Sequence, residues 1–287
     1  MITRKEILTV MEQNKEIPTL IDVYQHFREK ISDPRTPATE IADMISSDQA
    51  IATRVLRSAN SPFYGLMNRV TTIPHAIVII GFNGIHHIVL NTAVLNLFRD
   101  TTNRSREFDP HALWRHSSAT GLIARLIAKK IRYSAFEELF TAGLLHDIGK
   151  IYLFRYFLQD YLRVITTAKE KNILLKDAEE QILGITHSEI GGALLKAWNI
   201  PETLIYTTTF HHNLALAKDK IKAACVVHLA DILCRSLEIG SGGDEKVPLL
   251  NADAWAQLDL EPAMLNDIVD ELNREIDNFN VFGSESV

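Results

Sequence analysis

Apolar side chains recur along this chain with the period of an α-helix, and this pattern constrains the fold more than any other feature of the sequence. Ile51, Val55, Leu56 and Ala59 fall on one helical face. Runs in which polar and apolar residues alternate, as they do in half-buried strands, are very few. The sequence therefore predicts an all-α fold.

Two polar stretches interrupt the helical pattern. The segment from Phe98 to Pro110 contains little that a core would bury, and the glycine-rich segment from Gly240 to Pro248 predicts a flexible loop. Apolar residues at helical spacing between Met264 and Ile276 predict an amphipathic helix near the end of the chain. We therefore expect three parts: an N-terminal helical subdomain (1–100), a central helical domain (101–239), and a flexible loop with a C-terminal amphipathic helix (240–287).

Composition and charge exclude several classes of protein. Hydrophobic residues make up 46% of the chain, charged residues 23%, and the formal net charge is −6, so no direct nucleic-acid binding is expected. The first residues lack a secretory signal, and the apolar run from Ala76 to Phe82 is far shorter than the roughly 20 residues of a spanning helix. We expect a cytoplasmic protein without a membrane segment.

A set of polar residues in the central region carries the functional prediction. Most of them lie within or beside apolar helical runs, where an unpaired imidazole or carboxylate is costly unless it is paired or bound to a metal. The seven candidate metal ligands are His116, His146, Asp147, His187, His211, His212 and Asp231.

These residue types favour a transition metal. On a helix, His146 and Asp147 would both reach one ion, and His116 and Asp231 would raise the set to four ligands with open positions. The remaining three histidines would hold a second ion, with Asp147 bridging the two. Imidazole-rich ligation favours iron, manganese, zinc, cobalt or nickel over magnesium or calcium. We expect a divalent transition metal, with iron or manganese preferred, and up to two ions.

Such a centre supports hydrolysis of a phosphate ester, because a metal lowers the pKa of bound water and a second ion holds phosphoryl oxygens. Lys150, in the run "LLHDIGK", is the candidate catalytic residue: its ammonium group would bind phosphate or a developing oxyanion. A lysine there is also an ordinary way to end a helix.

Each residue also has an ordinary structural interpretation. A lone histidine is more often a hydrogen-bonded core or surface residue than a ligand, and Asp231 would pair with Arg235 one helical turn later. Only the joint occurrence of the set favours a metal centre. The other six histidines are interpreted as structural: His26, His75, His86, His87, His111 and His228.

The order His116, His146–Asp147, Asp231 resembles the HD superfamily of metal-dependent phosphohydrolases, in which "HDIGK" is a common motif. The segment "HSEIGG" from His187 and the pair His211–His212 resemble the HD-GYP branch, whose members hydrolyse cyclic dinucleotides at a multinuclear metal centre. The segment "NLALAKDK" follows the pair, and the residues that give this branch its name are absent.

The N-terminal region resembles a different branch, the HDOD family, through "IPTL" (17–20), "ISSDQAIATRVLRSANSPFYG" (45–65) and "TTIPHAIVIIGFNGIHHIVL" (71–90). The resemblance implies a multi-helix bundle of the HD type with an N-terminal helical subdomain. It also implies a bacterial signal-transduction or regulatory role, with other signalling proteins or a nucleotide as the partner. Many HDOD proteins lack metal ligands, whereas this chain keeps all seven. Two hypotheses follow: a regulatory HDOD protein with an intact metal centre, or an active metal-dependent phosphohydrolase acting on a nucleotide or other phosphoester.

Overall fold

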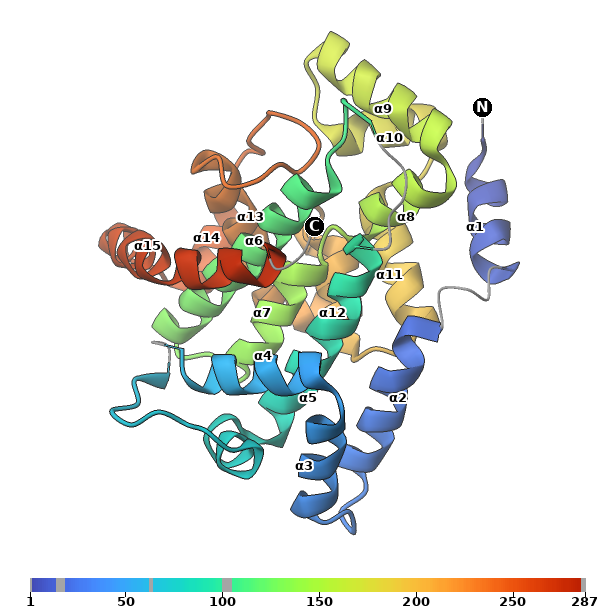
Figure 1. Cartoon of the computed structure of the whole chain (residues 1–287). Coiled ribbons are helices and arrows are strands. Elements are labelled where there is room, and N and C mark those ends of the chain that lie inside the picture. The colour runs from blue at the N-terminus through green and yellow to red at the C-terminus, as the bar shows by residue number, and fades with distance from the viewer. Residues whose placement is uncertain (1, 14–18, 62–63, 100–104, 285–287) are drawn as a thin grey trace. The chain divides into compact units, whose positions relative to one another are not determined.

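The computed structural model describes residues 2–13, 19–61, 64–99 and 105–284 (Figure 1). All regular structure in these ranges is helical, which confirms the all-α prediction. The first two residues of "IPTL" and part of the predicted boundary between Phe98 and Pro110 lie outside the described residues.

The chain divides into two compact units. One consists of residues 15–97, and the other of residues 1–14 together with 98–287. Residues 240–287, which the sequence analysis set apart from the central region, belong to the same unit as that region.

The unit of residues 15–97 is a small group of helices. Their bounds are α2 (Thr19–Ser32), α3 (Ala38–Ser47), α4 (Gln49–Ala59) and α5 (Ile73–Arg99), of which α5 runs two residues beyond the unit. Asp48 begins α4 by accepting hydrogen bonds from the backbone N–H groups of Ala50 and Ile51. Ile51, Val55 and Ala59 are buried, as the helical period predicts.

The larger unit contains the remaining helices. These are α1 (Arg4–Gln13), α6 (Pro110–Lys130), α7 (Phe136–Leu145), α8 (Ile148–Tyr156), α9 (Leu158–Lys171), α10 (Leu175–Leu183), α11 (His187–Ala197), α12 (Glu202–Phe210), α13 (Ile221–Ser236), α14 (Ala252–Leu258) and α15 (Pro262–Ser284), with 3₁₀ turns at Leu214–Leu216 and Lys218–Lys220. Helix α6 packs against α7, α13 and α15, and α11 packs against α8 and α12. The predicted C-terminal amphipathic helix is α15, which buries Ile268 and Leu272.

Within the described residues, one segment is long and apolar enough to cross a membrane by length and composition alone. It is Ile73–Leu95 of α5, and half of its most apolar window is buried in the structure. Gly81 interrupts the helical backbone inside this segment with φ 75° and ψ 161°.

Close backbone contacts between helices bring the functional residues together. Gly143 of α7 faces Gly121 of α6, and a Cβ on Gly143 would lie 2.7 Å from the Cα of Gly121. A Cβ on Gly149 of α8 would overlap the carbonyl group of His187 at the start of α11. Only glycine permits these approaches, because any side chain would push the helices apart.

We predict that Gly143→Ala destabilises the protein by about 1–3 kcal/mol or more, since the added methyl group meets backbone atoms that cannot rotate away. Thermal unfolding followed by circular dichroism should show a midpoint several degrees lower. An unchanged midpoint would mean that α6 and α7 do not need this close contact.

Candidate metal centre

The pair His146–Asp147 lies in the turn between α7 and α8, and not inside a helix as the sequence analysis assumed. The Nδ1 atom of His146 lies 2.6 Å from the carbonyl oxygen of Gly143, one turn back in α7. With Nδ1–H donating to that carbonyl, the Nε2 atom keeps its lone pair. The turn thus places the Nε2 atom of His146 and the carboxylate of Asp147 next to each other, where both can bind one ion.

Four of the predicted residues, His116, His146, Asp147 and Asp231, form a first group of candidate ligands. The Nε2 atom of His146 lies 3.2 Å from Asp147 Oδ2, and the Nε2 atom of His116, from α6, lies 3.5 Å from the same oxygen. Asp231, from α13, places Oδ1 3.1 Å from His116 Nε2. Ligand atoms about 2.0–2.2 Å from one ion lie roughly 3.0–3.5 Å from each other, so this spacing fits a shared ion.

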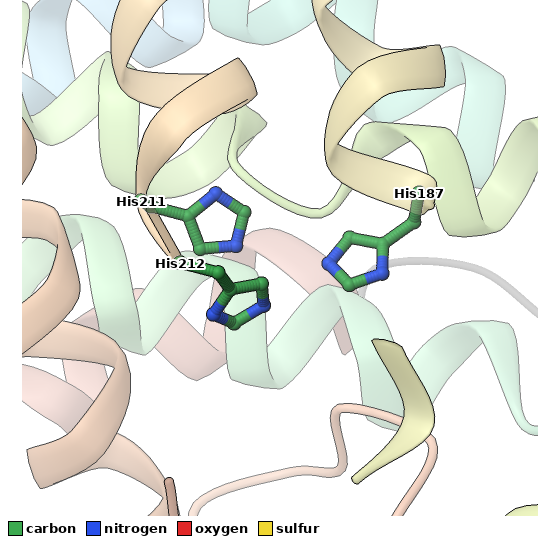
Figure 2. A group of neighbouring side chains, drawn as sticks. All are labelled: His187, His211 and His212. Carbon is green, nitrogen blue, oxygen red and sulfur yellow. The ribbon is translucent and has the colours of Figure 1, made fainter. Parts of the chain in front are cut away.

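The other three predicted residues form a second group beside the first. His187 begins α11, while His211 and His212 follow the end of α12, and the ring of His187 extends toward the other two (Figure 2). One ligand nitrogen from each lies within 4.8 Å of the others. The Nε2 atom of His187 lies 3.2 Å from Oδ1 of Asp147. The two carboxylate oxygens of Asp147 therefore face different groups of histidines.

Several atoms of the centre that could bind a metal ion are buried and make no hydrogen bond within the described residues. They are the Nε2 atoms of His116, His146, His187 and His211, and the Oδ1 atom of Asp147. A single buried polar atom left in this way costs about 1–3 kcal/mol. Five such atoms in one place fit a metal site, because lone pairs that lack hydrogen bonds are free to bind a metal ion. The residues present therefore fit one or two metal ions.

The pKa values of Asp147, Asp231 and His211 favour metal binding near neutral pH, whereas burial, which lowers the pKa of His187, is outweighed by Glu179, which raises it. Burial disfavours ionised Asp147, but His146 and Lys150 outweigh it and hold the pKa of Asp147 well below its ordinary value. Burial also disfavours ionised Asp231, but Arg235 and His116 outweigh it and hold the pKa of Asp231 well below its ordinary value. Burial lowers the pKa of His211 well below its ordinary value, so its imidazole stays neutral and able to bind a metal.

Residues around the centre fix the orientation of the ligands. Arg235 donates from Nε to Asp231 Oδ1 at 2.9 Å, so the predicted pairing at one helical turn is present. Arg235 also donates to Asp244 at 2.7 Å. The Nδ1 atom of His228 lies 2.9 Å from the carbonyl oxygen of His211. These contacts support a ligand role for Asp231, because a ligating carboxylate commonly has an outer partner.

Lys150 is fully buried in α8. Its ammonium group donates to Asp147 Oδ2 at 2.7 Å and to the carbonyl oxygen of Gly242 at 2.8 Å. Gly242 belongs to residues 240–246, which we call the strap. Two of the three N–H donors of the ammonium group are therefore engaged, so the predicted role of Lys150 in binding phosphate would have to use the third donor or displace the strap.

The strap is held in place, in contrast to the flexible loop predicted from its glycines. The Oδ1 atom of Asp244 accepts from Arg235, and Oδ2 accepts from the backbone N–H of Leu175 at 2.8 Å. Ser241 donates its backbone N–H to the carbonyl oxygen of Ala112. These partners lie in α13, α10 and α6, which the local sequence of the strap does not reveal.

Glu179 of α10 belongs to the centre but is not among the residues predicted from the sequence. Its carboxylate is fully buried and contacts the Nδ1 atom of His187 at 2.6 Å. Asp177, Glu179 and Glu180 occur within four residues, and their residue types alone do not show which one turns inward. The only available signal was the apolar face of α10, on which Leu175, Ala178 and Leu183 lie.

We predict that divalent transition metals stabilise the protein. An ion at 100 times its dissociation constant adds about 2.7 kcal/mol per site, which raises the melting temperature of chelator-treated protein by roughly 5 °C or more. Manganese should produce the shift in the wild type and in His111→Ala, an exposed histidine of α6. His116→Ala, on the same helix, should lose most of it. An unshifted wild type would exclude the centre.

Comparisons with known proteins identify the family and the fold of this chain. The HDOD domain family model matches residues 17–214. An uncharacterized protein of Treponema pallidum is 26% identical over 248 residues, which are 86% of this chain and 47% of that protein. The chain therefore spans about half the length of this curated relative.

Solved structures share the fold. An HDOD domain protein with unknown function from Geobacter sulfurreducens is 27% identical, with a TM-score of 0.76 over 97% of this chain and 96% of that one. A protein of Shewanella amazonensis, named as a candidate phosphohydrolase, is 21% identical, with a TM-score of 0.70 over 96% of each chain. Its likeness concerns the fold alone. With the family model covering well over half of its length, the chain belongs to the HDOD family.

Proposed function

We propose that this chain is a metal-dependent phosphohydrolase acting on a nucleotide or another phosphoester. One observation carries the proposal: seven donor residues from α6, the α7–α8 turn, α11, the end of α12 and α13 converge, and five of their buried atoms make no hydrogen bond within the described residues. The name of the Shewanella amazonensis protein, a candidate phosphohydrolase of the same fold, supports the same class of reaction.

The residues divide into two ligand groups that share one carboxylate. His116, His146 and Asp231 would hold one ion with Asp147 Oδ2. The second group of histidines would hold another ion with Asp147 Oδ1. We propose iron or manganese, because a mixed set of imidazoles and carboxylates suits these metals.

Bound metal supplies a water of lowered pKa and a positive charge for the phosphoryl oxygens. In the hydrolysis, the water oxygen forms a bond to phosphorus, the ester P–O bond breaks, and the leaving oxygen takes up a proton. Lys150 holds Asp147 Oδ2 in place through its 2.7 Å contact. His212 is the most exposed of the seven ligands, so a substrate would approach from its side.

A regulatory role is the second candidate, and the burial of the centre favours it. Six of the seven ligands are at most 1% exposed, and the strap engages the lysine that a phosphate would need. In this role the centre would shape a surface that binds a nucleotide or another signalling protein, without turnover.

The test is hydrolysis of a broad panel of phosphomonoesters, phosphodiesters and nucleotides with manganese or iron(II). We expect turnover that a chelator abolishes. His146→Ala and Asp147→Asn should reduce it by at least about 100-fold, because even outer partners of metal ligands contribute 10–100-fold. His111→Ala should retain it.

The two candidates give different results. Metal-dependent turnover that the ligand variants retain would contradict the proposed centre. If no substrate in the panel is turned over but a nucleotide binds in calorimetry, and still binds to His146→Ala, the regulatory role replaces hydrolysis.

A further inference from the structure

Glu179 is a buried carboxylate without a lysine or arginine partner among the described residues. It is fully buried, and the one ion pair that it forms there is with His187. Its Oε2 atom accepts the backbone N–H of His187 at 2.8 Å and lies 2.6 Å from the Nδ1 atom of the same residue. The hydroxyl group of Tyr161 donates to Oε1 at 3.4 Å. An ionised carboxylate in such surroundings is costly unless a positive charge lies close by.

The contact with Nδ1 decides which nitrogen of His187 can bind a metal. A carboxylate only accepts hydrogen bonds, so Nδ1 must carry the hydrogen, and Nε2 is left with the lone pair. That Nε2 atom is buried, makes no hydrogen bond within the described part of the chain, and lies 3.2 Å from Asp147 Oδ1. Glu179 thus orients His187 so that its Nε2 atom faces Asp147 Oδ1 and can bind the second ion.

Capping of α11 is the alternative, purely structural role for Glu179. The backbone N–H of His187 is at the first position of α11, where a carboxylate helps to cap a helix. However, α11 already has a complete capping box, in which Thr186 and Glu189 satisfy each other's backbone N–H groups. Capping also does not account for the contact to Nδ1.

We propose that Glu179 is the positioning residue for the second metal ion, which it retains by fixing the ring orientation and tautomer of His187. This inference rests on the proposed metal centre and adds to it a residue outside the ligand set. Carboxylate–histidine–metal chains of this kind are worth about 10–100-fold in metal affinity.

The test counts and titrates manganese in metal-stripped protein, by elemental analysis after gel filtration and by calorimetry. The wild type should bind two ions. Glu179→Gln keeps the shape of the side chain and should weaken one ion by about 10–100-fold. Glu179→Ala should lose that ion and keep the other. Glu180→Gln, an exposed neighbour on α10, should behave as the wild type.

A double-variant cycle separates positioning from capping. His187→Ala should lose the same ion, and Glu179→Ala combined with His187→Ala should lose no more than either change alone, because both act on one ligand. A role in capping only would lower the melting temperature of the metal-free variants while leaving two ions of unchanged affinity.

Failure of the positioning role and failure of the metal centre would give different results. Two ions of unchanged affinity in both folded Glu179 variants would overturn the positioning role and leave the metal centre intact. A wild type that takes up no manganese, iron or zinc would overturn the metal centre, and this inference with it. Loss of both ions from Glu179→Gln, with its circular dichroism unchanged, would also contradict a role confined to His187.

Discussion

The metal centre depends on how the buried carboxylate of Asp147 is stabilised. An ionised group without solvent exposure is tolerated only where positive charge and hydrogen bonds surround it. Lys150 provides a cation on Oδ2, and imidazoles face both oxygens. Because Nδ1 carries the hydrogen in His146 and His187, the Nε2 atoms that face Asp147 have none to donate unless the rings are protonated. A metal ion between them would satisfy the carboxylate and the rings together.

Buried polar contacts connect the candidate metal ligands to the helices around them. Asp231 is held by Arg235, which is held in turn by Asp244 of the strap, and Asp244 reaches the first residue of α10. Glu179, farther along α10, contacts His187. The ligands are therefore fixed by a chain of buried polar contacts that joins α10, α11, α13 and the strap, and removing one member leaves its partner buried and unpaired.

Sequence patterns predicted the helical fold because the period of apolar residues is local. They also identified a set of polar residues that the fold brings together from separate helices. The turn at His146–Asp147 was placed in a helix, because an apolar run on both sides hides a two-residue break. The fixed strap and the inward turn of Glu179 depend on partners far away in the sequence, Arg235 and His187 among them. Local patterns cannot show such contacts.

The most direct test of the metal centre is anomalous X-ray diffraction from crystals of manganese-loaded protein, measured on both sides of the manganese absorption edge. We predict two anomalous peaks about 3.5–4 Å apart, one on each side of the Asp147 carboxylate. One peak lies near His116 and Asp231, and the other near His187 and the His211–His212 pair. Anomalous density elsewhere in the protein, with none at Asp147, would contradict the proposed metal centre.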